Sequence, residues 1–343
     1  MSIKYIFCVI LLFYQNIVNS YKHQPILFIP GLGGSRLQKN GISIWPPDIK
    51  WMLLNPEKYR DMLLHDNELQ TLQFGNKKSV DIYSNYMKLF IKTNPFEKIL
   101  ALENLHAIPY DFRNIDRQYI LSFNAKLKSY IEEFDEPIKC VTHSSGGLIF
   151  HYFLHCQTSK WKKKYIKEVF NVNVPFTGTI CSLKQVTQST IYDFISNIFL
   201  FSMGCVIMNF PNKKYMNNPV LIVNNIEKDY IEYFGLQKEN EIYRQNEDII
   251  NTFSVTNGVK TTIIYSTTTE LITPTTIHIN NNNDLKKDSM TIIYGEGDGL
   301  IPLSSMLHPK IWSRSDLDIV HIKDILHTDV LCSDELISII SSN

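Results

Sequence analysis

The chain has 343 residues, of which 44% are hydrophobic, so it is long enough for one large packed domain with insertions or for two domains. Lys and Arg together number 34, as do Asp and Glu, which gives a formal net charge of zero. This balance, with no basic stripe carrying interleaved aromatic residues, argues against a nucleic-acid-binding protein.

The first 20 residues have the pattern of a secretory signal peptide. Lys4 precedes an apolar run from Tyr5 to Tyr14, and the small residues Val18 and Ser20 fit cleavage after Ser20. An uncleaved anchor is the alternative, but the apolar run is short for a bilayer span. We therefore predict a signal peptide over 1–20 and a mature chain over 21–343. The expected location is outside the cell or in an endomembrane, lysosome-like lumen.

The cysteines that follow the signal are odd in number. Five remain, so an exported chain would keep at least one free thiol or form an intermolecular bridge. Cys140 lies on a predicted strand and Cys156 on a predicted helix, and both are expected to be buried. Any disulfide would then have to come from Cys181, Cys205 and Cys332, and the sequence does not choose among them.

The first predicted strand lies between Pro25 and Pro30, where a short apolar run ends at the glycine-rich segment Gly31–Gly34. A polar region with prolines follows, and its part from 41 to 67 is predicted to be a lid insertion. Pro109–Arg113 closes another short strand. Asn114 is expected to cap a helix with apolar residues at spacings of three and four. These apolar residues are Ile120, Phe123, Leu127, Ile131 and Phe134.

The clearest strand–turn–helix pattern is CVTHSSGGLIF, from Cys140 to Phe150. A strand is predicted over Ile138–Thr142, and a helix is predicted from the turn to about Gln157. Ser144 lies at the turn between them, flanked by small residues. A serine in this position is typical of a nucleophile elbow, although an ordinary turn has the same residue types.

Beyond this helix, Val169–Val174 is the next predicted strand. The alternation of strands and helices then fades from 176 to 257, which predicts a cap insertion, and a final helix begins near Ser333. The later strands are expected at Thr261–Ser266, Met290–Tyr294 and Asp318–Ile322. The overall pattern predicts an α/β protein with a mostly parallel sheet and helices on both faces.

A nucleophilic serine needs a base to remove its proton, and the base needs a carboxylate to orient it. On sheets of this kind the residues follow in the order serine, acid, histidine. Asp298 lies in a glycine-rich loop after the strand at Met290–Tyr294, and His327 follows the strand at Asp318–Ile322. Ser144, Asp298 and His327 therefore form a candidate triad in the required order, which predicts the α/β-hydrolase fold.

Other acids and histidines compete for these roles. Glu296 lies on the same loop as Asp298 but earlier, closer to the strand, so Asp298 is preferred. His321 lies within a predicted strand and His308 precedes a proline, so both are expected to be structural.

Two patterns suggest a bound ion or nucleotide at first sight. His151 and His155 are spaced like a zinc pair, but no glutamate lies between them and no third ligand is evident. The glycines from Gly295 to Gly299 lack the residues of a nucleotide-binding loop. We therefore expect neither a metal nor a cofactor.

An acyl-transfer site also needs donors for the oxyanion. One should be the backbone N–H of Ser145, directly after the nucleophile, and the other should come from a loop after an early strand. The segment Gly31–Gly34 is in that place, and its glycines let the backbone approach a substrate closely.

These motifs together resemble the lecithin:cholesterol acyltransferase family, whose members include the lysosomal phospholipase A2. The resemblance covers nearly the whole mature chain. Its motifs are Pro30–Leu37 (PGLGGSRL), Ile44–Trp45, Pro109–Arg113 (PYDFR), His143–Gly147 (HSSGG), Tyr152–Leu154, Val174–Gly178 (VPFTG), Tyr294–Gly299 (YGEGDG) and Ile325–His327 (ILH).

The resemblance implies the triad that the chain order predicts. It also implies that the backbone N–H groups of Leu32 and Ser145 hold the oxyanion, and that Trp45 belongs to a mobile lid near the acyl site. The chain departs from the family pattern where Thr142 replaces glycine, Phe112 replaces tryptophan and Phe176-Thr177-Gly178 replaces Trp-Gly-Gly. It also lacks the lid disulfide of the animal members, because no cysteine lies between 21 and 139.

The predicted lid carries an apolar cluster among polar residues: Trp45, Trp51, Met52, Leu53 and Leu54. An exposed cluster of this kind marks an interaction surface, whereas packing on the core is the alternative. We predict that it contacts a phospholipid membrane or lipid particle.

The expected function is that of an enzyme that cleaves a phospholipid acyl ester through an acyl-serine. The acyl group then passes to water or to a lipid alcohol. A neutral lipase or carboxylesterase is the alternative among enzymes, and a catalytically inactive lipid carrier is the alternative from another class.

Overall fold

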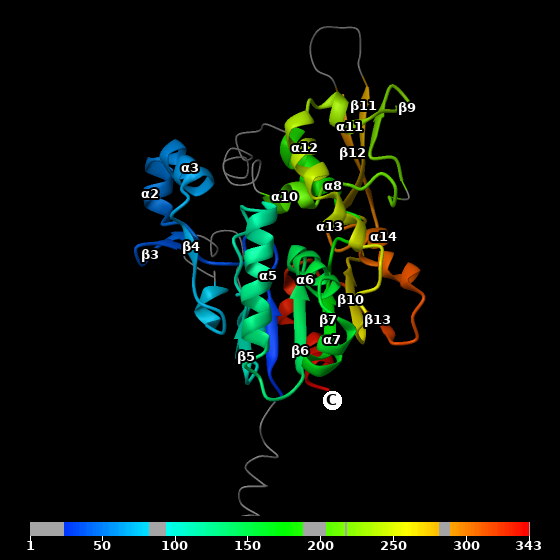
Figure 1. Cartoon of the computed structure of the whole chain (residues 1–343). Coiled ribbons are helices and arrows are strands. Elements are labelled where there is room, and N and C mark those ends of the chain that lie inside the picture. Colours follow the sequence, from blue (N-terminus) through cyan, green and yellow to red (C-terminus); the bar gives the residue numbers. More distant parts are fainter. Residues whose placement is uncertain (1–23, 82–93, 188–203, 217, 281–288, 343) are drawn as a thin grey trace, which may run out of the picture.

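The computed structural model describes residues 24–81, 94–187, 204–216, 218–280 and 289–342 (Figure 1). The predicted signal peptide over 1–20 lies outside them. Among the described helices, none is both long and apolar enough to cross a membrane.

A sheet of six parallel strands forms the centre of the molecule, in the order β13-β10-β7-β6-β1-β5. The strands are β1 (Ile26–Ile29), β5 (Leu105–Ala107), β6 (Ile138–His143), β7 (Ile166–Val172), β10 (Thr261–Thr267) and β13 (Leu317–Lys323). Thr142 near the end of β6 pairs with Ile29 of β1 and with Asn171 of β7. The carboxyl ends of these three strands therefore meet at one edge, where the loops that follow them come together.

The central strands β1 and β6 are buried on both faces, which is typical of a parallel sheet covered on both sides. In β1, Leu27 and Ile29 face one core, whereas Ile26 and Phe28 face the other. The first core lies under α5 (Arg117–Ile131), α6 (Ser145–His155) and α7 (Ser159–Tyr165); the second lies under α4 (Glu97–Ala101) and α15 (Asp334–Ser341). The predicted α/β class with helices on both faces is confirmed.

Helix α5 buries the predicted face, with Ile120, Phe123, Leu127 and Ile131 in the core. The predicted cap at Asn114 is wrong. Asp116 caps the helix instead, because its carboxylate accepts hydrogen bonds from the N–H groups of Gln118 and Tyr119. The Asn114 side chain accepts from the N–H of Asp116 and forms the turn that precedes the helix. Phe134 lies beyond the helix end.

The segment predicted as a lid, 41–67, lies within a slightly larger unit, 37–71, beside the main sheet (Figure 1). It contains β2 (Leu37–Lys39), β3 (Ile42–Trp45) and β4 (Gln70–Thr71), paired in the order β3-β2-β4. Between β3 and β4 lie α2 (Ile49–Leu54) and α3 (Pro56–His65). The 3-10 helix η1 (Lys77–Ser79) follows β4.

A polar clamp holds this unit to the main domain. Arg113 donates to the carbonyls of Leu63 (2.9 Å) and Asp66 (3.1 Å) at the end of α3. Asp111 orients the guanidinium through two bonds of 2.8 and 2.6 Å. A cation at the carboxyl end of a helix also interacts favourably with the helix dipole. Two residues of the PYDFR motif thus attach the predicted lid to the main domain through hydrogen bonds.

Between β7 and β10 the chain forms a cap of short helices above the sheet (Figure 1). They are α8 (Ile180–Thr187), α10 (Gly204–Met208), α11 (Tyr230–Tyr233), α12 (Gln237–Gln245) and α13 (Glu247–Thr252). The cap also contributes β8 (Leu221–Val223) and β9 (Ile226–Glu227) to a second sheet.

This second sheet corrects the strand prediction for the late part of the chain. Met290–Tyr294 does form a strand, β12 (Ser289–Gly295), but β12 lies outside the main sheet. It pairs antiparallel with β11 (Thr273–Asn280), and the sheet order is β12-β11-β8-β9. Strand β11 was not predicted, because Pro274 within the run and the absence of a continuous apolar stretch weaken its signal.

The last elements complete the domain. They are α14 (Leu303–Met306) and two 3-10 helices, η3 (His308–Trp312) and η4 (Asp329–Cys332). Ser333 caps α15, as its position near the predicted start of the final helix suggested.

The cysteine predictions hold only in part. Cys140 is buried on β6, but the prediction that Cys156 is buried is wrong. Cys156 lies at the C-cap of α6, one position past the helix, where the chain turns into solvent. Of the three candidates for a disulfide (Cys181, Cys205 and Cys332), Cys205 and Cys332 carry free thiols in the structure.

Candidate active site

Ser144 lies at the turn between β6 and α6, as predicted. Its backbone has φ 52° and ψ −133°, in a region that non-glycine residues rarely adopt. Such a conformation costs about 1–3 kcal/mol and persists only where the surroundings impose it. The N–H of Ser144 donates to the carbonyl of Val172 at 3.0 Å, which holds the turn against the end of β7.

Two glycines after the serine allow α6 to begin directly against the sheet. A Cβ atom on Gly146 would lie 2.2 Å from the carbonyl oxygen of Pro30, and one on Gly147 would lie 2.2 Å from a methyl of Val174. Larger residues would push the helix away from the strands and move the serine with it. The small residues of the HSSGG motif are therefore required by packing.

The glycine-to-threonine departure at Thr142 is accommodated within β6. Its hydroxyl is buried and donates to the side-chain oxygen of Asn171 on β7 at 2.7 Å. The space above it is left by Gly147, where an added Cβ would lie 3.0 Å from the hydroxyl. The larger side chain at Thr142 thus fits because Gly147 has no side chain.

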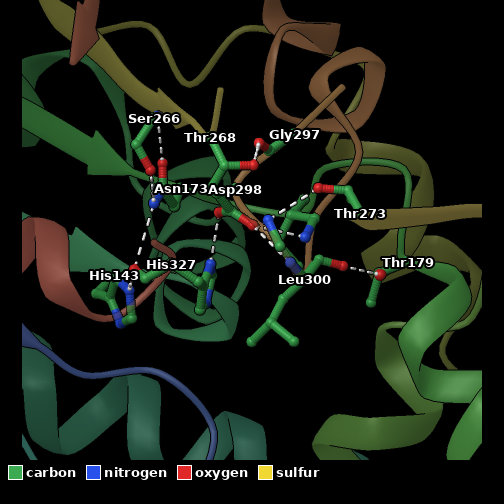
Figure 2. A network of polar contacts seen from close by, with 12 residues as sticks. His143, Asn173, Thr179, Ser266, Thr268, Thr273, Gly297, Asp298, Leu300 and His327 are labelled. Carbon is green, nitrogen blue, oxygen red and sulfur yellow. Dashed lines mark hydrogen bonds and ion pairs between the residues drawn. The ribbon is translucent and has the colours of Figure 1, made fainter. Parts of the chain in front are cut away.

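Asp298 and His327 form a close pair (Figure 2). Oδ2 of Asp298 lies 2.6 Å from Nδ1 of His327. Oδ1 of Asp298 accepts from the N–H groups of Leu300 (3.0 Å) and Ile301 (2.7 Å). The carboxyl is fully buried. Because an ionised carboxylate only accepts, Nδ1 of His327 carries the proton and Nε2 is left unprotonated.

Between β10 and Asp298, the chain forms two strands of the second sheet. After β12, the chain returns to the main sheet where the N–H of Thr268 donates to the carbonyl of Gly297 at 2.9 Å (Figure 2). The competing acid, Glu296, is exposed on the same loop, whereas Asp298 faces the histidine. The geometry thus distinguishes two acids that lie two positions apart in the sequence.

Ser144 and His327 line one cavity of about 180 Å³. Its lining residues are Gly31, Leu32, His143, Ser144, Ser145, Thr179, Cys181, Ser182, Val206, Asn209, Leu300, Ile301, His327 and Thr328. Ser145 is the first residue of α6, so its N–H has no partner within the helix and is directed beyond its end. The cavity therefore contains Ser144, His327 and both predicted oxyanion residues, with Asp298 behind the histidine.

Trp45 is not among the residues that line this cavity. It lies behind the glycine-rich loop, where its indole N–H donates to the carbonyl of Gly33 at 2.6 Å. The ring also packs edge-on against Phe112 at 5.8 Å. Trp45 thus supports the loop that carries Leu32, and its role in substrate binding stays a prediction.

Two cap residues of the cavity were not found from the sequence. Asn209 is buried and donates from Nδ2 to the hydroxyl of Ser145 at 2.6 Å. Thr179 donates from its hydroxyl to the carbonyl of Leu300 at 2.5 Å, which joins the cap to the loop of the acid. Both lie in an insertion without a periodic pattern or motif, so the sequence gives no signal for them.

His308 and His321 have structural contacts, as predicted, and so does His151. His151 is buried, and its Nε2 lies 2.9 Å and 3.0 Å from the carbonyls of Thr252 and Val255. His308 bonds to Ser254, and His321 bonds to Thr267. Within the described ranges, no three His, Cys, Asp or Glu side chains lie together in a way that could hold a metal ion.

The fold and the elbow define a protein of the α/β-hydrolase class. A similar fold is found in the crystal structure of the Tle4–Tli4 complex, with a TM-score of 0.63 at 12% identity, covering 90% of this chain and 95% of that one. Residues 77–200 match the family model described as lecithin:cholesterol acyltransferase. The resemblance to this family that the motifs indicated is confirmed.

Individual relatives support the same family. The lecithin-cholesterol acyltransferase-like 1 protein of Arabidopsis thaliana is 23% identical, over 90% of this chain and 86% of its own. The human lysosomal phospholipase A and acyltransferase is 23% identical over 61% of this chain, and the match spans 54% of that protein. The phosphatidylcholine-sterol acyltransferase of Gallus gallus is 22% identical over 67% of this chain and 59% of its own.

Proposed function

We propose that the chain is a serine-dependent lipid acyl hydrolase and O-acyltransferase that acts on phospholipid esters. The observation that carries this proposal is the Asp298–His327 pair at 2.6 Å, with His327 lining the same cavity as the strained Ser144. The family match and the names of the relatives support the lipid ester as the substrate class.

In the proposed reaction, the hydroxyl of Ser144 attacks the ester carbonyl while Nε2 of His327 takes its proton. The N–H groups of Leu32 and Ser145 stabilise the oxyanion, aided by the positive end of α6. The intermediate collapses to an acyl-serine, and His327 returns the proton to the leaving alcohol. Water or a lipid alcohol then attacks the acyl-serine with His327 as the base, and Ser144 is released.

The surroundings of the cavity fit an acyl chain. Val206 and Ile301 line it, and Leu300 at its edge is 45% exposed. Leu326, which precedes the proposed base, is 44% exposed. Apolar groups at the mouth of a site favour entry of a hydrocarbon chain, because its burial removes apolar surface from water. We propose that the enzyme works at a phospholipid surface, in a lysosomal or secreted lumen like the lysosomal relatives.

The decisive experiment combines a covalent probe with product analysis. A fluorophosphonate should label Ser144, and incubation with phosphatidylcholine liposomes should release fatty acid and lysophospholipid. Liposomes that also contain a sterol or another long-chain alcohol should yield acylated acceptor as well, because a dry cavity slows attack by water. Ser144→Ala protein is the control.

The other outcomes separate the alternatives. Hydrolysis of triacylglycerol or short esters without cleavage of phospholipid would indicate a neutral lipase or carboxylesterase. Lipid binding with neither labelling nor product would indicate a carrier. Fatty acid as the sole acyl product with every acceptor would leave a phospholipase without transferase activity.

The lid supplies a further prediction, with a correction to the predicted cluster. Met52 is buried in the core, and Trp51 packs edge-on against Tyr59 at 5.8 Å. Only Leu53 and Leu54 project into solvent, at 60% and 80% exposure. We expect these two leucines to contact the membrane, because exposed apolar side chains gain free energy by leaving water.

Leu53→Asp and Leu54→Asp should therefore lower turnover on liposomes by about tenfold, which corresponds to about 1.4 kcal/mol of lost surface binding. Turnover of a short soluble ester should stay unchanged. Leu121→Asp is the matched control, since Leu121 is 50% exposed on α5, outside the lid. Equal losses on both substrates would contradict the membrane role of the lid.

A further inference from the structure

His143, the residue before the proposed nucleophile, forms a hydrogen bond with the backbone of the proposed base, His327. The ring of His143 is 4% exposed, and its Nε2 lies 3.0 Å from the backbone carbonyl oxygen of His327 (Figure 2). A carbonyl only accepts hydrogen bonds, so Nε2 of His143 carries the proton and donates. The end of β6 thus supplies both the proposed nucleophile and a donor that holds the residue of the base.

A second buried donor reaches the same carbonyl. Nδ2 of Asn173 lies 3.3 Å from the oxygen of His327 and 2.7 Å from the hydroxyl of Ser266. Its orientation is fixed, because Oδ1 of Asn173 accepts from the N–H of Ser266 at 2.8 Å. Asn173 follows β7, so the ends of two neighbouring strands converge on one peptide group of His327.

The other side of His327 is held by the acid. Its N–H donates to the backbone carbonyl of Asp298 at 2.9 Å, in addition to the bond between the two side chains. Both backbone polar groups of His327 are therefore bonded to buried partners. The imidazole depends on this support, because a bond at Nδ1 alone leaves the ring free to swing about that bond.

His143 also packs against the loop proposed to hold the oxyanion. A Cβ on Gly31 would lie 3.1 Å from Nδ1 of His143 and 2.8 Å from Cβ of Ser144. The rings of His143 and His327 are 4.7 Å apart between centroids. One side chain is therefore in contact with the base and with the glycine-rich loop, and it is joined through the backbone to the nucleophile.

The charge of His143 suits this position. Burial, and next to it the neighbouring His327, lower the pKa of His143 to about 3. His143 therefore stays neutral at physiological pH. A neutral donor can hold the carbonyl without repelling the positive charge that His327 gains when it takes the proton of the serine.

We propose that His143 is a positioning residue, whose N–H sets the backbone of His327 so that the imidazole faces Ser144. The inference rests on the proposed function, since it assigns a role in the same triad. Misplacement of a reacting group by about 1 Å costs about 100-fold in rate, so the loss of one of two donors should cost about 10- to 100-fold.

The test compares variants that differ only in the donor. His143→Leu removes it, His143→Gln can place an amide N–H near the position of Nε2, and His143→Asn is one methylene too short. The matched control is His151→Leu, because His151 is also a buried histidine that donates to carbonyls but does not line the cavity. The readouts are the rate of fluorophosphonate labelling of Ser144, and kcat and KM for a short soluble ester.

We expect His143→Leu to lower kcat and the labelling rate by about 10- to 100-fold with KM nearly unchanged. His143→Gln should recover most of both, whereas His151→Leu should lower the melting temperature and leave both intact. If His143→Leu fails to fold, the Gln and Asn variants carry the test, with Gln near wild type and Asn slow.

Three results would overturn the inference: a His143→Leu enzyme as fast as wild type, Gln and Asn variants that are equally slow, or an equal loss in His151→Leu. A wild-type protein that is neither labelled nor active would instead refute the proposed function, and with it the premise of this role.

Discussion

Ser144→Ala should lower turnover of any ester by about 10⁶-fold, as removal of the nucleophile does when the rest of a serine triad is intact. The fold should be retained, because alanine keeps the Cβ atom that the close approach of Gly31 accommodates. Thermal melting within a degree or two of wild type, together with loss of fluorophosphonate labelling, is the expected pair of results. Substantial residual esterase activity would show that Ser144 is not the nucleophile.

Ser145→Ala is a matched control for this experiment. It removes the neighbouring hydroxyl, which accepts from Asn209, but keeps the backbone N–H proposed for the oxyanion. Turnover should therefore fall far less than in Ser144→Ala. Ser144→Gly provides a second comparison, because glycine adopts a positive φ without strain. It should be as inactive as the alanine variant but more stable by about 1 kcal/mol.

Asp298→Asn should lower turnover by about 10⁴-fold, the effect that this change has in a serine protease triad. Oδ2 of Asp298 accepts a hydrogen bond from Nδ1–H of His327 at 2.6 Å. An amide N–H in place of Oδ2 would donate to Nδ1 instead, which favours the wrong histidine tautomer. The other carboxyl oxygen accepts two backbone N–H groups, and an amide oxygen can still do so. The loop should therefore keep its shape, and the loss should appear in kcat.

Glu296→Gln makes the same chemical change two positions earlier, on an exposed side chain. We expect its kcat to stay close to that of wild type. Steady-state kinetics of both variants on one soluble ester would decide the assignment. A larger loss in Glu296→Gln than in Asp298→Asn would show that the acid has been misassigned.

The features predicted correctly are those with a local physical cause. The first strand, β1, is predictable because burial on both faces makes it continuously apolar. The turn at Ser144 was visible because small residues must follow it, and the structure shows the contacts that Gly146 and Gly147 avoid. The face of α5 followed from its spacing of three and four residues.

The features that were missed depend on contacts between distant segments. Nothing in the sequence near Met290–Tyr294 indicates that β12 pairs with β11 in a separate sheet. Likewise, Asn209 and Thr179 reach the cavity from an insertion, and their roles depend on how the cap lies over the sheet. Asp116 rather than Asn114 is the N-cap of α5. The two residues lie two positions apart and both have side chains that cap helices well, so the sequence does not distinguish them.

The path of the chain between β10 and Asp298 has a consequence for how proteins of this fold can vary in sequence. The chain leaves the main sheet after β10, builds β11 and β12, and returns where Gly297 bonds to Thr268. The point of exit and the point of return are thus adjacent, so a change in the length of the segment between them need not move Asp298. Substitutions and length changes within β11 and β12 can therefore accumulate while Asp298 keeps its place beside His327. In this architecture, the segment between β10 and the loop of Asp298 can change independently of the Asp298–His327 pair.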